Sequence, residues 1–87
     1  MRRIRGKMKI YDYNGKANIV GPMIREARVR QHLTQDELAI KMQLENIEIS
    51  QKVISRIEKQ ERFVADFELK VFCKVLKMDI GELLSAE

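Results

Sequence analysis

Four apolar residues in the C-terminal half of the chain recur at the spacing that one face of an α-helix requires. They stand at i, i+3, i+4 and i+7, and are Leu69, Phe72, Cys73 and Leu76. Such a stripe predicts an amphipathic helix that buries one side. A chain of 87 residues forms at most one small domain. We therefore expect the stripe to pack against other short helices in a single core.

Polar residues mark where other helices begin and end. Thr34 is followed three residues later by Glu37, which is the pattern of a capping box. Ser50 precedes a segment with isoleucines at i and i+3, and serine is a favoured N-cap. Asn46 is expected to end the helix that follows Thr34, because asparagine tolerates the left-handed backbone conformation.

These signals predict an all-α fold, a compact five-helix bundle in which the second and third helices form a helix-turn-helix. Residues 21–87 are expected to form this domain, and residues 1–20 a basic N-terminal arm with a short extended segment near residues 8–13. The pair Gly21-Pro22 marks the boundary, because proline suits the first turn of a helix. The expected helices run from Pro22 to Gln31, from Thr34 to Asn46, from Ser50 to Glu58, from about Asp66 to Leu76 and onward from Asp79.

Positive charge is concentrated in the arm. Residues 1–20 contain six Lys and Arg and one acid, whereas the other 67 residues contain 11 basic and 12 acidic residues. The net charge of +4 is therefore weak evidence that the domain itself binds nucleic acid. Two interpretations of the arm stay open, namely a solvated tail and a segment that lies along DNA phosphates.

The rest of the composition argues against several classes of protein. With one cysteine and one histidine, Cys73 and His32, we expect no internal disulfide and no metal site. Cys73 is interpreted as a small core hydrophobe. No apolar run approaches the roughly 20 residues that span a bilayer, and no signal peptide is evident, which predicts a cytoplasmic protein. We find no catalytic constellation and no glycine-rich phosphate loop, so we expect neither an enzyme nor a cofactor or small-molecule substrate.

The helix expected from Ser50 to Glu58 has an outer surface suited to DNA bases. If its isoleucines face the core, the residues that face outward near its N-terminal half are Gln51, Lys52, Ser55 and Arg56. Glutamine can bond adenine through two hydrogen bonds, and arginine or lysine can donate to guanine O6 and N7. No acid precedes Glu58 in this helix, so no carboxylate there would repel phosphate. The plainer interpretation of Lys52 and Arg56 is that they are solubilising charges.

Three segments resemble a known family when they are taken in order. They are Ile24-Arg25-Glu26-Ala27-Arg28, then Leu33-Thr34-Gln35-Asp36-Glu37-Leu38-Ala39, then Ile54-Ser55-Arg56-Ile57-Glu58. Together with a final Asp79-Ile80-Gly81-Glu82-Leu83-Leu84 segment, they make residues 21–86 similar to the lambda-repressor-like helix-turn-helix family of phage-repressor and Xre type. The resemblance implies a transcriptional regulator, most simply a repressor, that binds double-stranded DNA as a homodimer.

The resemblance also implies roles for single residues. Gln51, Lys52, Ser55 and Arg56 would contact bases, and Gln35 and Arg62 would contact phosphates. We also expect a phosphate contact from Lys59, in the polar loop that follows the helix. Arg28 would pair with Glu58, which is consistent with two charges at half-buried positions. Gln35 as a plain surface residue is the alternative.

Two features depart from the family pattern. The connection at residues 44–49 makes this chain about five residues longer between the two helices, although Ile47 and Ile49 supply apolar anchors. Gln60 also stands where the family usually has glycine.

A second class of function stays open. The same fold could serve as a protein-interaction module, such as an antitoxin or anti-regulator. Capture of a protein partner by this chain, together with no affinity for DNA at low salt, would favour that alternative.

Overall fold

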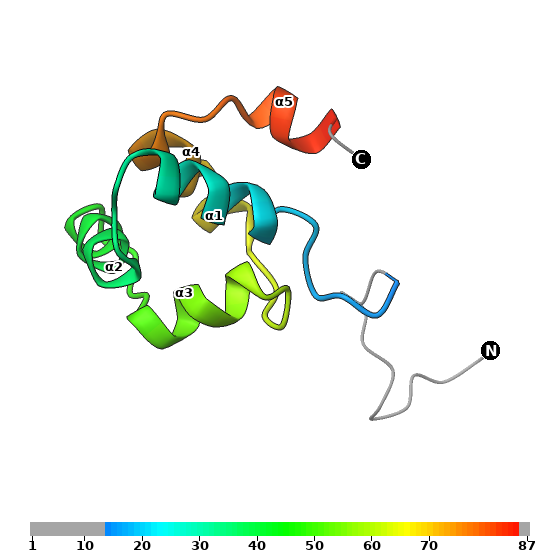
Figure 1. The fold of residues 1–87 in the computed structure, drawn as a ribbon, viewed down its shortest axis with the longest axis horizontal. Helices are drawn as coiled ribbons and strands as arrows, with labels where there is room; N and C mark the ends of the chain where they lie inside the picture. Colours follow the sequence, from blue (N-terminus) through cyan, green and yellow to red (C-terminus); the bar gives the residue numbers. More distant parts are fainter. Residues whose placement is uncertain (1–13, 86–87) are drawn as a thin grey trace.

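The computed structural model describes residues 14–85, and this part of the chain is all-helical (Figure 1). The expected all-α class is confirmed. The extended segment expected near residues 8–13 lies outside the described residues. Five helices follow one another as α1 (Gly21–Arg30), α2 (Gln35–Leu44), α3 (Gln51–Glu58), α4 (Asp66–Leu76) and α5 (Ile80–Ser85).

The starts of α2 and α3 follow the expected capping residues. Thr34 Oγ1 accepts a hydrogen bond from the Glu37 backbone N–H at 3.0 Å, and the Glu37 carboxylate accepts one from the Thr34 N–H at 2.8 Å. Ser50 Oγ accepts from the Val53 N–H at 3.3 Å. Both side chains thus satisfy backbone donors that the first helical turn leaves free.

The first four helices end in the same way, on a residue in the left-handed conformation. At the end of α3, the Glu61 N–H donates to the Arg56 carbonyl at 2.8 Å and the Gln60 N–H donates to that of Ile57 at 2.9 Å. This pair of bonds is the Schellman pattern, in which the residue that donates the inner bond, here Gln60, takes a positive φ. The left-handed residues that end the four helices are His32 (φ 60), Asn46 (φ 66), Gln60 (φ 64) and Lys77 (φ 57). None of them is glycine.

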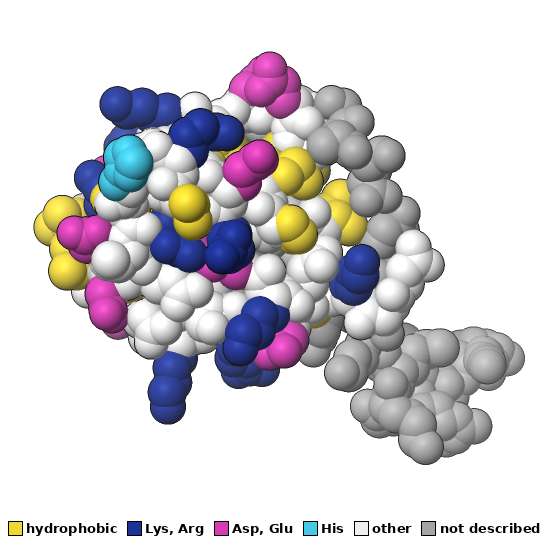
Figure 2. Space-filling model, viewed as in Figure 1, with side chains coloured by type: hydrophobic (Ala, Val, Ile, Leu, Met, Phe, Trp, Pro, Cys, Tyr) yellow, Lys and Arg dark blue, Asp and Glu magenta, His cyan; other side chains and the backbone are white. Residues whose placement is uncertain are grey.

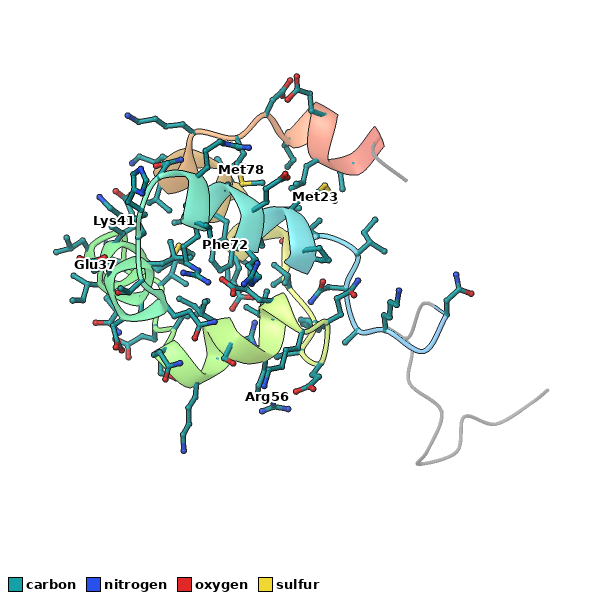
Figure 3. The ribbon with its side chains drawn as sticks, viewed as in Figure 1. Met23, Glu37, Lys41, Arg56, Phe72 and Met78 are labelled. Carbon is teal, nitrogen blue, oxygen red and sulfur yellow. The ribbon has the colours of Figure 1, made fainter. Side chains whose placement is uncertain are left out.

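The core lies between α1, α2, α3 and α4, and Phe72 of α4 lies in its interior (Figure 3). The isoleucines of α3 that were expected to face inward are fully buried, as are the leucine and methionine of the α2 face. The expected α4 stripe is also buried, except for Leu69, which is only partly so. The largest fully buried side chains are Phe72, Ile24, Leu38, Met42, Ile49, Ile54, Ile57 and Leu76.

The packed part of the chain begins before the boundary that we placed between residues 20 and 21. The Asn18 side chain is buried and donates to the carbonyl oxygens of Ile57 at 3.0 Å and Arg62 at 2.9 Å. Its own oxygen accepts from the Gly21 N–H at 2.8 Å, and Val20 belongs to the core. The sequence placed Asn18 in the arm because a single polar residue carries no sign of such distant partners.

Helix α5 docks through only part of its apolar surface. Leu83 is buried, but Ile80 and Leu84 are exposed. The Asp79 carboxylate, directly before the helix, accepts a hydrogen bond from the Gly81 N–H at 3.1 Å. A single apolar anchor therefore holds this short helix against the bundle.

The long connection between α2 and α3 is anchored to the domain. Ile49 is buried in the core, and its carbonyl oxygen accepts from the side chain of Gln43 at 3.0 Å. Ile47 packs partly against the core, and its N–H donates to the Met42 carbonyl at 3.0 Å. The two apolar anchors predicted from the sequence thus contact the domain, while Glu48 between them is exposed.

Candidate nucleic-acid interface

Helix α3 has one buried side and one exposed side. Ile54 and Ile57 are fully buried, whereas Lys52 and Arg56 are exposed. Figure 3 shows Arg56 extending from α3 away from the bundle, on the side opposite Phe72. We call the outward set the recognition face, and it consists of Gln51, Lys52, Ser55 and Arg56, of which Gln51 and Ser55 are half-buried.

Positively charged side chains lie along this side of the molecule, as they do on other parts of its surface. Figure 2 shows lysine and arginine side chains along the edge that α3 forms. Lys59, the C-cap of α3, is exposed as well. The single acid of the helix, Glu58, is buried rather than exposed. Exposed Glu61 follows the helix and lines a shallow depression together with Arg56 and Arg62, so one carboxylate lies among these positive side chains.

A buried ion pair holds the C-terminal end of α3 against α1. Arg28 Nε and Nη2 donate to the two Glu58 carboxylate oxygens at 2.7 and 3.1 Å. Arg28 Nη1 also donates to the Leu33 carbonyl at 2.7 Å. The side chains of Arg28 and Glu58 are 11% and 3% exposed. The structure thus contains the expected pair, and its two-pronged geometry compensates for the removal of both charges from water.

Two of the glutamines expected to contact DNA are joined to this pair and to each other. Gln35 Nε2 donates to Glu58 Oε1 at 2.9 Å, and Gln51 Nε2 donates to Gln35 Oε1 at 2.7 Å. Gln35 and Gln51 are the first residues of α2 and α3. The sequence predicted the two residues as separate contacts to phosphate and base, and missed the bonds between them. The one feature that the two glutamines share in the sequence is their position directly after an N-cap residue, and this was the available sign of a common role.

Arg62, expected at a phosphate, is engaged within the protein. Its Nη1 and Nη2 donate to the two Glu68 carboxylate oxygens at 2.7 and 3.1 Å, and Nη1 also donates to the Phe63 carbonyl at 2.9 Å. Its guanidinium carbon lies 6.0 Å from the centre of the Phe63 ring. The sequence missed Glu68 as a partner because the two residues are separated by the loop before α4.

The environment of Glu68 favours its charged form. Burial raises the pKa of the Glu68 carboxyl, but the hydrogen bonds from Arg62 and from the Ala65 N–H, with the nearby Arg62 charge, outweigh burial and lower the pKa below its ordinary value. Arg62 therefore faces a carboxylate at neutral pH, which reduces its net attraction for a phosphate.

Within residues 14–85 the structure shows no group of three or more side chains arranged to hold a metal ion. In the same residues, no helix combines the length and the hydrophobicity needed to cross a bilayer. Comparisons of this chain with protein-family models, with curated proteins and with solved structures found no match.

Proposed function

We propose that this protein is a sequence-specific regulator of transcription, most simply a repressor, that inserts α3 into the major groove of double-stranded DNA. The observation that carries the proposal is the two-sided character of α3. Two fully buried isoleucines fix its inner side, while its outer side carries Lys52 and Arg56 and no free acid. A helix with such an outer side fits a groove about 12 Å wide and can donate to base edges there.

Under this proposal, the residues of the recognition face make different contacts with DNA. Arg56 and Lys52 donate to guanine O6 and N7, and Gln51 bonds adenine. Ser55 is short and half-buried, so it reaches only a base that lies against the helix.

Exposed Lys59 contacts a phosphate, and such a contact sets position rather than sequence preference. Arg62 and Gln35, which were also expected at phosphates, direct their donors to Glu68 and Glu58 within the protein.

Two copies of the chain on one operator complete the proposal. A single domain of this size offers few base contacts, so specific binding is expected to require a homodimer on two half-sites about one helical turn apart. The sequence resemblance described above points to the same arrangement.

The decisive experiment is selection of bound sites from random DNA at a stated salt concentration, because affinity for DNA depends on salt. An enriched pair of half-sites is the expected result. Enrichment of no sequence, with no affinity at low salt, would exclude the proposal.

Replacement of Arg56 tests which residues produce the preference. Arg56→Ala should weaken binding to the selected site by about 1–3 kcal/mol and relax the preference at one base pair. Arg30→Ala is the matched control, because exposed Arg30 lines a pocket with Met78, which Figure 3 places on the side of the bundle away from Arg56. Equal weakening on selected and random DNA would instead make Arg56 a phosphate contact.

A second function is favoured by one observation. Two apolar side chains on α2, Ile40 and Leu44, are 56% and 77% exposed, and exposed apolar groups often mark protein contacts. A protein-interaction module, such as an antitoxin or anti-regulator, would use a surface of this kind. This second candidate becomes the better one if the selection enriches no DNA sequence.

A further inference from the structure

The segment directly before α1 is bonded to the end of α3 and to the loop that follows it (Figure 1). Within the described part of the chain, four hydrogen bonds of 2.9 to 3.0 Å join residues 17–18 to residues 57–62. We call these bonds the clasp, and the residues that make it are Ala17, Asn18, Ile57, Gln60 and Arg62. We propose that the clasp fixes the backbone of Lys59 for its contact with a DNA phosphate, which makes Asn18 a positioning residue for DNA binding. This inference rests on the proposed function, and it gives a residue outside the helix-turn-helix a part in DNA affinity.

Asn18 suits its place in the clasp because its amide both donates and accepts hydrogen bonds. The residue is buried, at 9% exposed. Its NH₂ group donates to the carbonyl oxygens of Ile57, in the last turn of α3, and of Arg62, in the loop. Its side-chain oxygen accepts from the Gly21 N–H at 2.8 Å. An ionised aspartate has the same size but can only accept, so it would set a carboxylate against two carbonyl oxygens.

Gln60 is bonded to the segment before α1 through both its backbone and its side chain. Its carbonyl oxygen accepts from the Ala17 N–H at 3.0 Å, and its Nε2 donates to the Asn18 carbonyl at 3.0 Å. Gln60 holds a left-handed conformation that glycine would adopt more easily, but glycine could not make the second bond. The clasp thus gives a physical reason for glutamine at the position where the resembled family usually has glycine.

Lys59 lies between two residues that are both fixed to other parts of the domain. Glu58 is held by Arg28 at 2.7 and 3.1 Å, and Gln60 is held by the clasp. Lys59 itself is exposed at the end of α3. Its long side chain loses rotational freedom when it binds a phosphate. A backbone that is already fixed adds no further ordering cost, whereas a loop released from the clasp must be ordered on binding, which weakens the contact.

The test measures how affinity for DNA depends on salt. Each phosphate that the protein neutralises adds about 0.9 to the magnitude of the slope of log affinity against log salt concentration. Asn18 carries no charge, so a smaller slope in Asn18→Ala means that a charged residue elsewhere has lost its phosphate. We expect the slope to fall by up to about 0.9, and binding to selected and random DNA to weaken alike, roughly 3- to 10-fold at about 0.1 M salt. An unchanged slope, with specific binding retained, would overturn the inference and leave the proposed function intact.

A second substitution identifies the charged residue that depends on Asn18. Lys59→Met should lower the magnitude of the slope by about 0.9, and adding Asn18→Ala to it should lower the slope no further. If Asn18→Ala lowered the slope equally with and without Lys59, the basic residues before Asn18 would be the ones affected, and the inference would be overturned. The order of preference among bases should be the same in all these variants, because a phosphate contact does not read sequence.

Gln60→Met decides the question if Asn18→Ala does not fold. It removes one bond of the clasp from a half-buried side chain and should lower the slope in the same direction, and an unchanged slope would overturn the inference. Gln31→Met is the matched control, because half-buried Gln31 also lies at the end of a helix and donates its amide to a distant carbonyl, that of Leu76 in α4. Its slope should equal that of the wild type, and a fall would show that general loosening of the fold is responsible, against the inference. Absence of any DNA binding at low salt would refute the proposed function itself, an outcome distinct from an unchanged slope.

Discussion

The backbone of Gly21 lies so close to the carbonyl oxygen of Ile57 that a Cβ added to the glycine would be 2.1 Å from that oxygen. The first turn of α1 therefore touches the last turn of α3 through backbone atoms. We expect Gly21→Ala to destabilise the fold by about 3 kcal/mol, because two backbones must separate to admit a methyl group. Urea unfolding would measure this loss.

Gly81→Ala is the matched control for this substitution. A Cβ at Gly81 would lie 3.6 Å from the nearest atom, the Asp79 carboxylate, which is an ordinary contact. Alanine also favours the helix at this position. The close approach described for Gly21 would be contradicted if both substitutions changed the unfolding free energy alike.

Breaking the ion pair between Arg28 and Glu58 from either side should be costly. Arg28→Met leaves a buried carboxylate with only the Gln35 amide, and we expect a loss of about 3–5 kcal/mol in unfolding free energy. Glu58→Met leaves an uncompensated buried guanidinium and should cost a similar amount. The double variant should cost much less than the two losses together, because neither charge then stands alone. If the loss of unfolding free energy in the double variant equals the sum of the two single losses within about 0.5 kcal/mol, the two residues act independently.

Glu68 makes stability depend on pH in a defined direction. Its pKa in the folded state lies below the ordinary 4.5. The resulting stabilisation is therefore fully present above that value and is lost as the pH falls through the folded-state pKa. Glu68→Gln should be less stable than the wild type at about pH 7, and the difference should shrink by about pH 3. Chemical unfolding at both pH values measures the effect. The exposed residue Glu48 offers a control, since Glu48→Gln should keep the wild-type pH dependence.

Lys77 ends α4 in a conformation that glycine adopts more easily. Its φ is 57°, and its side chain is exposed. Relief of this left-handed strain outweighs the greater freedom of glycine in the unfolded chain. We expect Lys77→Gly to stabilise the fold by about 0.5–1 kcal/mol, or several degrees in thermal midpoint. Lys70→Gly, within the same helix, should destabilise instead, and stabilisation by both would point to a charge effect.

Local chemistry explains which parts of the fold could be predicted from the sequence. The Thr34 cap, the Ser50 cap and the left-handed Asn46 depend on neighbours within four residues, and the structure contains all three. The helical stripes also follow from spacing alone. The all-α class was therefore accessible without any knowledge of how the helices pack.

Interactions between distant residues were less accessible. Asn18 was assigned to the arm, yet its bonds reach residues 39 and 44 positions away. The bond between Gln35 and Gln51 depends on how closely the two helix starts approach, which the spacing of apolar residues does not determine. The pairing of Arg62 with Glu68 depends likewise on the path of the loop before α4. The surface of α3 could be listed from the sequence, but the partners that orient its side chains could not.

The connection between α2 and α3 sets the start of α3 through anchors rather than through its length. Ile49 inserts into the core just before the Ser50 cap, and Gln43 holds its carbonyl oxygen. The exposed residues between these anchors contribute little to that placement. Insertion or removal of exposed residues in this loop should therefore leave the position of α3, and with it the proposed contacts to DNA, unchanged.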